Sequence, residues 1–193
     1  MKDIKMFREV TDNENIIIFN SISKISSKIS LILKEIDYKI YLALNNKISK
    51  NDNPSIFLIP NNLIKHLANL SQEIRVDSAG LYFGFIKKRE FYLSLEGTEF
   101  LLNLSCFSED HKIYVNEEGE KSILYGNKIL KSMILNIPLN LKKNSFLLVF
   151  NPNNELIAIA NSKVSYSAYQ NLNYNDLVAL NLVDKGYYLR KKQ

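Results

Sequence analysis

The sequence is poor in the residue types that build disulfides, metal sites and phosphate-binding loops. Its 193 residues include one cysteine, Cys106, so no internal disulfide can form, which suits a reducing interior. The two histidines, His66 and His111, have no partner at the spacing of an H-x-x-x-H or C-x-x-C motif. The six glycines form neither G-x-G-x-x-G nor G-x-x-x-x-G-K-[ST]. We therefore expect no metal, no cofactor and no catalytic activity, with Cys106 a buried inert thiol and His66 partly buried in a helix.

Long apolar runs are also missing. No stretch approaches the roughly 18–20 apolar residues that cross a bilayer. The first five residues, M-K-D-I-K, mix both charge signs and lack the apolar segment of a signal peptide. We expect a soluble, intracellular protein with no membrane partner.

The sequence does have abundant core material and an uneven charge distribution. Hydrophobic residues make up 46% of the chain, enough to pack one large domain or two small ones. The net charge is +5; residues 1–110 contain 14 basic and 14 acidic residues, whereas residues 111–193 contain 11 and 6. A polyanion would therefore be attracted mainly to the C-terminal part. Five extra charges over this length are also compatible with ordinary surface variation.

The first 110 residues alternate helix and strand patterns. Thr11 and Glu14 have the spacing of a capping box, and isoleucines then recur at helical intervals from Ile18 to Ile29, over about five turns. Apolar runs predict strands at residues 31–36, 38–44, 55–59, 81–85 and 91–93. Further patterns predict helices at 61–70 and 97–104, a hairpin-like loop at 45–54 and a charged turn at 87–90.

A polar break at residues 105–110 is the predicted domain boundary. After it, short apolar runs predict strands at 112–115, 145–150, 155–160 and 177–183. The second and third of these strands are joined by N-P-N-N at residues 151–154, a good turn sequence. Several short strands at close spacing indicate a small β-barrel or sandwich.

The most informative segment is the string S-I-L-Y-G-N-K-I-L-K-S at residues 122–132. It resembles the signature of PUA domains, and more closely that of the Nip-seven family of ribosome-biogenesis factors, which reads roughly S-F-L-Y-G-N-x-V-L-K-S. Weaker likenesses to the same family follow the right order: the helical region from Met6 to Ile29, L-Y-F-G-F-I at residues 81–86 and D-K-G-Y-Y-L-R at residues 184–190. The resemblance therefore covers most of the chain.

The resemblance bears on an ambiguity in the signature itself. By periodicity alone, residues 125–135 could form one continuous helix. The PUA resemblance instead implies a short helix near 119–125, a break at Gly126 and Asn127, and a strand from Lys128 onward; both break residues tolerate positive φ. It implies an α+β fold, with an N-terminal α+β domain of residues 1–110 followed by a PUA-like mixed β-barrel of residues 111–193.

The same resemblance suggests where RNA would bind. In PUA domains RNA lies against this helix and the glycine-containing turn, where backbone can approach phosphates and lysines supply charge. The candidate RNA contacts are Gly126, Lys128, Lys131, Lys163, Arg190 and Lys191. For each lysine alone, a plain exposed charge is an equally good interpretation. Tyr166 and Tyr169 could stack on bases, although packing against the protein is the preferred interpretation.

Three departures from the family pattern affect this prediction. Glu117 and Glu118 occupy the positions of a usual Pro-Gly, and Met133 and Leu135 stand where glycines are expected. The turn A-N-S-K at residues 160–163 is followed by an uncharged stretch at 164–170, so an expected basic patch is missing. The basic tail from Arg190 could replace it in part.

The resemblance implies a non-catalytic RNA-binding factor of large-subunit ribosome assembly. Its partners would be pre-rRNA, U-rich or single-stranded, bound by the PUA domain, and other assembly proteins, bound by the N-terminal domain through the apolar strand at 55–59. We expect a monomer, in the cytoplasm if the protein is archaeal and in the nucleus or nucleolus if it is eukaryotic. Two alternatives stay open: a PUA-containing protein-interaction module that has lost RNA binding, and an accessory subunit of an RNA-modification enzyme.

Overall fold

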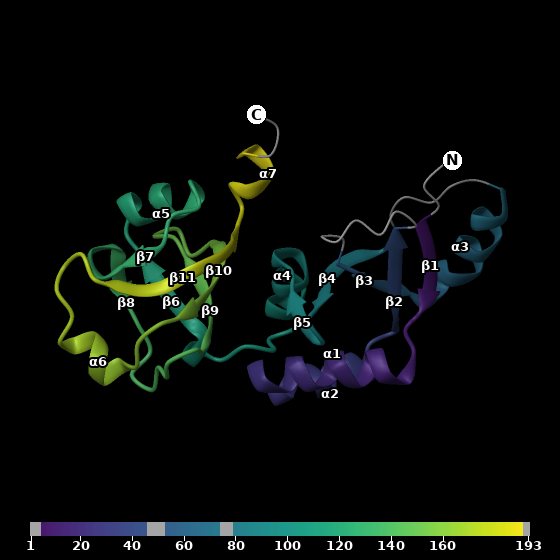
Figure 1. Cartoon of the computed structure of the whole chain (residues 1–193), viewed down its shortest axis with the longest axis horizontal. Coiled ribbons are helices and arrows are strands. Elements are labelled where there is room, and N and C mark those ends of the chain that lie inside the picture. Colours follow the sequence, from purple (N-terminus) through teal and green to yellow (C-terminus); the bar gives the residue numbers. More distant parts are fainter. Residues whose placement is uncertain (1–4, 46–52, 74–78, 191–193) are drawn as a thin grey trace. The chain divides into compact units, whose positions relative to one another are not determined.

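The chain forms two compact units, Met1–Cys106 and Phe107–Gln193, in a computed structural model that describes residues 5–45, 53–73 and 79–190 (Figure 1). The first is a mixed α/β unit and the second a nearly closed mixed β-barrel. The predicted α+β fold, with a PUA-like barrel after an α+β region, is therefore confirmed.

The first unit is built on a five-stranded antiparallel sheet with its strands in chain order. The strands are β1 (Lys5–Glu9), β2 (Tyr38–Asn45), β3 (Ser55–Pro60), β4 (Leu81–Lys87) and β5 (Glu90–Leu93). The helices are α1 (Asp12–Ile25), α2 (Ser27–Glu35), α3 (Asn61–Glu73) and α4 (Leu95–Asn103). The predicted strands at 38–44, 55–59, 81–85 and 91–93 and helices at 61–70 and 97–104 are confirmed. The predicted loop at 45–54 lies mostly outside the described residues.

Helix α1 begins at the predicted capping box. The Thr11 hydroxyl accepts a hydrogen bond from the Glu14 amide (3.4 Å), and the Thr11 amide donates one to the Glu14 carboxylate (2.8 Å). The same carboxylate accepts two hydrogen bonds from Arg8 on β1, at 2.6 and 2.7 Å. These bonds, above all those from Arg8, lower the pKa of Glu14 to about 2. The carboxylate thus joins the start of α1 to the edge strand of the sheet.

The expectation of a strand at 31–36 is wrong, because this segment belongs to α2. The helical pattern breaks at Ser26, whose extended backbone (φ −156°, ψ 128°) separates α1 from α2 and whose hydroxyl donates to the Cys106 carbonyl (3.1 Å). Ile29 and Leu33, one helical turn apart, are the buried residues of α2. A six-residue apolar run has too few residues to distinguish a strand from part of an amphipathic helix, and here burial selected the helix.

Strand β3 is the central strand of the sheet and is buried on both faces. Its residues 56–59 are at most 6% exposed. Phe57 packs between Phe7 and Tyr82, with ring centres 5.5 and 5.6 Å apart, on the face that α3 covers, and Ile56 points to the opposite face. The expectation that residues 55–59 form a protein-contact surface is therefore wrong, because a continuous apolar run is typical of a strand covered on both sides.

Strands β4 and β5 form a hairpin whose two-residue turn is Lys88 and Arg89. Lys87 pairs with Glu90, and φ is +50° at Lys88 and +62° at Arg89. Positive φ at both central residues is the geometry of a type I′ turn, for which Asn-Gly is favoured. A lysine or arginine in the left-handed conformation costs roughly 1–2 kcal/mol. The turn therefore has a sequence that opposes its own backbone geometry.

The second unit contains a six-stranded sheet in the order β7-β11-β10-β9-β6-β8, in which β6 and β9 are parallel and the other pairs antiparallel. Its strands are β6 (Lys112–Val115), β7 (Ile129–Leu130), β8 (Ile134–Asn136), β9 (Phe146–Phe150), β10 (Leu156–Ser162) and β11 (Leu177–Asp184). Its helices are α5 (Glu117–Leu124), α6 (Tyr166–Gln170) and α7 (Tyr187–Arg190). The edge strands β7 and β8 are linked by one 3-10 turn, η2 (Lys131–Met133), which nearly closes the barrel.

The barrel encloses an aliphatic core. Four of its six strands, β6, β9, β10 and β11, match the four predicted after the polar break. Ile113, Ile129, Leu147 and Val178, from four different strands, are all fully buried in this core. Residues 125–135 form a turn, a short strand and a 3-10 turn, so the single continuous helix allowed by periodicity is excluded.

The two residues flagged as potential reactive groups in the first unit have ordinary environments. Cys106 is buried, as expected, and burial raises the pKa of its thiol. His66 lies on the exposed side of α3, so the expectation of partial burial is wrong.

The Glu14 carboxylate should make the stability of the first unit depend on pH. Its folded-state pKa of about 2 lies below the ordinary 4.5, so its contribution is present above about pH 4.5 and is lost as pH falls toward 2. Glu14→Gln should lower the free energy of unfolding by about 1 kcal/mol at pH 7, and by much less near pH 2. Urea denaturation at both pH values measures this, with Glu35→Gln on the exposed side of α2 as the control. A penalty for Glu14→Gln that is the same at both pH values would contradict the assignment.

The hairpin turn provides a stabilising substitution. Lys88→Asn combined with Arg89→Gly places residues that accept positive φ in both central positions, and should raise the free energy of unfolding by about 1–2 kcal/mol. Thermal and urea denaturation of the full chain measure the gain. A loss of stability would mean that the two long side chains contribute more than their strained backbone costs.

Candidate nucleic-acid interface

Helix α5 has an acidic beginning. Asn116 caps it, accepting a hydrogen bond from the Gly119 amide (2.8 Å) and donating one to the Ser132 carbonyl (3.0 Å). Three carboxylates, Glu117, Glu118 and Glu120, occupy the first turn, where they complement the positive end of the helix dipole. They would repel a phosphate, so the amino end of α5 is not an anion site.

Helix α5 ends in a Schellman motif centred on Gly126. Its φ is +87°, its amide donates to the Ile123 carbonyl (2.8 Å), and the Asn127 amide donates to the Ser122 carbonyl (3.2 Å). The Asn127 side chain adds a bond to the Ser122 hydroxyl (3.2 Å). The Gly-Asn pair of the signature is therefore explained by backbone geometry, and the predicted break at these two residues is confirmed.

A buried carboxylate, Asp184, positions the two side chains that hold this turn. Asp184 is 2% exposed and accepts hydrogen bonds from both terminal nitrogens of Arg190, at 2.9 and 3.0 Å, and from the Asn181 amide group (3.0 Å). The Asn181 amide also donates to the Ile123 carbonyl, and the Arg190 guanidinium to the Leu124 carbonyl. The Leu124 carbonyl thus receives a donor from the last helix, and the Ile123 carbonyl receives one from the last strand in addition to its bond from the Gly126 amide.

Gly186 makes this contact sterically possible. A Cβ atom at Gly186 would lie 1.9 Å from the Leu124 carbonyl oxygen, so no other residue fits against the end of α5. A Cβ atom at Gly126 would lie 3.1 Å from the Arg190 guanidinium. The D-x-G-x-x-x-R pattern near the C-terminus is therefore a device that fixes the position of the Gly126 turn.

The structure gives the predicted RNA contacts different environments. Gly126 and Lys128 lie exposed at the turn, and Arg190 lies against it, engaged with Asp184. Lys131 is engaged elsewhere: its ammonium group donates to the carbonyls of Leu172 (2.6 Å) and Gln170 (3.3 Å) and lies 5.3 Å from the centre of the Tyr169 ring.

Lys163 has partners of its own. The Lys163 ammonium donates to the Asn161 side chain (3.4 Å), and the Lys163 amide joins the sheet at Val178. Lys191 lies outside the described residues. The turn thus brings together three of the six candidates, and the RNA contacts themselves stay a prediction.

The exposed aromatic side chains of the second unit are not those considered from the sequence. Tyr166 and Tyr169 pack against the barrel core, which confirms the preferred interpretation for them. Tyr125 is 76% exposed and directly precedes Gly126; Tyr174 is 71% exposed. The exposure of Tyr125 could have been predicted from the sequence. Tyr125 lies four residues after Lys121, an exposed residue, and therefore on the solvent side of α5.

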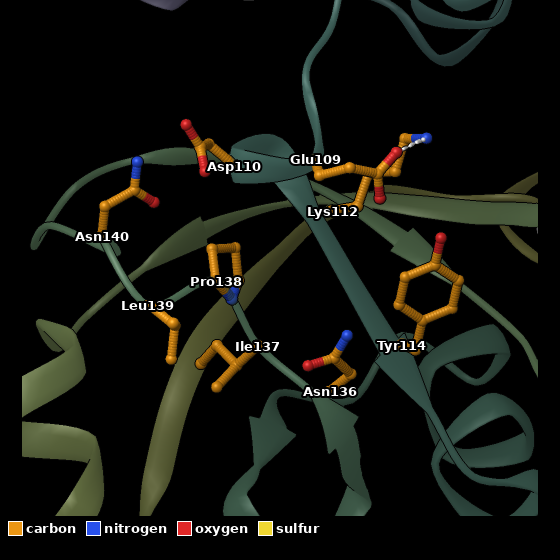
Figure 2. A pocket seen from close by; sticks show the side chains of 9 residues that line it. All are labelled: Glu109, Asp110, Lys112, Tyr114, Asn136, Ile137, Pro138, Leu139 and Asn140. Atoms are coloured by element: carbon orange, nitrogen blue, oxygen red, sulfur yellow. Dashed lines mark hydrogen bonds and ion pairs between the residues drawn. The ribbon is translucent and has the colours of Figure 1, made fainter.

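A pocket of about 390 Å³ lies elsewhere on the second unit, where β6 meets the segment after β8 (Figure 2). Glu109 and Asp110 lie at its rim, and Glu109 pairs with Lys112 at 2.6 Å. Ile137, Pro138 and Leu139 form an apolar wall (Figure 2). With two carboxylates and one ammonium group it suits neither a polyanion nor a metal ion. Across the described ranges no cluster of three or more potential metal ligands occurs, and no helix there is long and apolar enough to span a membrane.

The second unit is a nearly closed mixed barrel whose short helix ends in a glycine turn, and residues of the last strand hold that turn. This arrangement defines it as a PUA domain. Residues 111–193 match the family model described as the UPF0113 PUA domain, and residues 7–95 match the pre-PUA domain of NIP7 and UPF0113 proteins. The chain belongs to the NIP7/UPF0113 family.

Named relatives and solved structures agree with this assignment. The chain is 26% identical to the 60S ribosome subunit biogenesis protein NIP7 homologue of Danio rerio (96% of this chain, 97% of the relative) and 25% identical to NIP7 of Saccharomyces cerevisiae (95% and 96%). It is 33% identical to a UPF0113 protein of Archaeoglobus fulgidus over 63% of this chain and 66% of the relative. The fold matches a conserved PUA-domain protein of Thermoplasma acidophilum with a TM-score of 0.61 and 13% identity, covering 97% and 99% of the two chains.

The Asp184 network should control the order of the Gly126 turn. Asp184→Asn leaves the Arg190 guanidinium without its buried anion, so amide hydrogen exchange at Gly126 and Asn127 should become about tenfold faster or more, a loss of roughly 1.4 kcal/mol of local stability. Lys185→Gln, an exposed neighbour, is the control. Unchanged exchange at both amides would show that Asp184 does not hold the turn.

Proposed function

We propose that this protein is a non-catalytic RNA-binding factor in the assembly of the large ribosomal subunit, and that it binds pre-rRNA at the Gly126 turn of its PUA domain. The near-full-length relatives named as 60S biogenesis proteins support the assembly role. The basic excess of residues 111–193 supports a polyanionic ligand.

One observation carries the RNA-binding proposal. Within four consecutive residues, the exposed turn presents an aromatic ring (Tyr125), a glycine, an amide side chain (Asn127) and an ammonium group (Lys128). A ring stacks on an unpaired base, an ammonium group binds phosphate, and glycine lets the strand approach the backbone. Single-stranded RNA, U-rich in the simplest case, is the ligand that uses all of them. No cofactor takes part.

The first unit has a different role in this proposal: it contacts other assembly proteins, although not through the buried strand β3. The protein acts as a monomer, in the nucleolus of a eukaryotic cell or the cytoplasm of an archaeal one. An accessory role in RNA modification is the weaker alternative, because it would need a catalytic partner to which no feature of this chain points.

A second candidate function has a specific observation in its favour. Lys131 is used inside the domain, and three carboxylates stand at the start of α5. Both facts reduce the cationic surface near the turn, as in a PUA domain that has become a protein-interaction module. Binding to RNA at low salt separates the two functions.

The test is the affinity of the full chain for an oligouridylate, measured by fluorescence anisotropy at two salt concentrations. Lys128→Gln and Tyr125→Val should each weaken binding by about 1–3 kcal/mol, since one removes a phosphate contact and the other a stacking ring. Affinity of the unaltered protein should fall steeply as salt rises. Lys143→Gln, which removes an exposed charge elsewhere in the same unit, is the matched control. Negligible affinity at low salt would favour the interaction module, and unchanged affinity in both turn variants would move the RNA site elsewhere.

A further inference from the structure

We propose that the β4–β5 hairpin of the first unit is a second contact surface for single-stranded RNA, with Tyr92 as the stacking residue and Lys87, Lys88 and Arg89 as the phosphate contacts. This inference rests on the proposed function, since it takes RNA as the ligand of the protein. It gives the pre-PUA domain a direct part in RNA binding.

The hairpin carries a flat aromatic surface. The rings of Phe85 and Tyr92, on paired positions of β4 and β5, are stacked with centres 5.2 Å apart and planes inclined by 11°. Tyr92 is 40% exposed, and Phe85 is partly exposed. Aromatic residues on the surface of a β-sheet are a recurrent platform for unpaired RNA bases, because a base continues such a stack at little cost.

The register of the sheet places this pair on one of its two faces. Phe85 pairs with Ser55, two residues before Phe57, so the stacked pair lies on the face that α3 covers. Among the described residues, the side chains that pack on this face with Ile64 and Leu67 of α3 include Tyr82 on β4. The Phe85–Tyr92 pair belongs to the next part of the same face, beside the hairpin turn.

Three consecutive cations adjoin the platform. Lys87, Lys88 and Arg89 are all exposed, and Lys87 lies two residues after Phe85, on the same face. The only carboxylate in the turn, Glu90, accepts a hydrogen bond from the Tyr92 hydroxyl (3.1 Å) and lies 3.9 Å from Lys24. Its charge therefore opposes the cations less than that of a free carboxylate.

The backbone of the turn gives an independent reason to assign function here. Lys88 and Arg89 both adopt positive φ, which long side chains oppose and which Asn-Gly would accept freely. Two cations in strained positions, at the end of an aromatic platform, indicate that the charges have a use. Stacking rings combined with cations suit a nucleic-acid strand better than an apolar protein surface.

One variant removes the cations of the proposed surface and another removes its exposed ring. Both are made in the full chain. Lys88→Asn with Arg89→Gly deletes two charges while fitting the turn, so weaker binding cannot come from an unfolded hairpin. Its control, Lys28→Gln with Lys34→Gln, deletes two exposed charges from α2 in the same unit. Tyr92→Val removes the ring from a strand position, and Tyr92→Phe keeps it.

The measurement is affinity for an oligouridylate of about 12 nucleotides, within the size range of single-strand sites. Tyr92→Val and the hairpin charge variant should each lower affinity about tenfold, and both controls should leave it within about twofold. In the charge variant the slope of log affinity against log salt should fall by about 1.4, or 0.7 per lost cation.

Photocrosslinking with 4-thiouridine in the same oligomer separates this proposal from the PUA site. Crosslinks at Tyr92 or Phe85, together with others near Tyr125, support both sites. Crosslinks at the hairpin alone keep this proposal and overturn the PUA turn as the RNA site. Crosslinks at the turn alone, with hairpin variants that bind as the unaltered protein does, overturn this proposal and leave the proposed function standing. No crosslink at all overturns both, and leaves the hairpin as a surface for some other partner.

Discussion

The position of the candidate RNA site depends on the hydrogen bonds that the carbonyl groups in the last turn of α5 accept. A helix leaves its final carbonyls without intrahelical partners. Here the Leu124 carbonyl accepts a hydrogen bond from Arg190, and the Ile123 carbonyl accepts one from Asn181 as well as one from the Gly126 amide. Both side-chain donors are held by the buried carboxylate of Asp184. The consequence reaches the surface: the Gly126 turn sits on this network, and the residues that could meet RNA are displayed from the turn. The C-terminal motif therefore acts on a site some 60 residues earlier in the chain.

Several charged side chains of this protein have partners within the fold, so its net charge overstates the positive charge available to a ligand. The excess of basic residues lies after residue 110, yet Lys131 stabilises the segment after α6 and Arg190 neutralises Asp184. The acids at the start of α5 stabilise the helix dipole at the cost of repelling anions there. Of the basic candidates that the structure describes, Lys128 is exposed at the turn, three residues after the exposed ring of Tyr125. Affinity for RNA at this site would then depend on stacking as much as on charge.

Both units combine an aromatic ring with nearby cations on a local turn, although their architectures differ. In the barrel the ring ends a helix, at Tyr125; in the first unit it lies on a sheet, at Tyr92, next to the Lys88–Arg89 turn. In each case the buried core positions the turn without using its exposed side chains. Such turns can change their ligand contacts with little effect on the core, which is compatible with the low identity between this chain and its relatives.

Elements with a strong local signal could be predicted before the structure was known. The capping box at Thr11 and the strands with strong apolar runs follow from residues close together in the chain, whereas the break at Gly126 was implied by the resemblance of residues 122–132 to the family signature and not by periodicity. Features that depend on distant partners were set by tertiary packing. Residues 31–35 belong to helix α2 because Ile29 and Leu33 are buried together, and strand β3 is buried because it is the central strand of the sheet. Tertiary packing also gave Lys131 and Arg190 internal partners and left Tyr125 exposed, since a side chain's availability to RNA is set by the atoms that the fold brings around it.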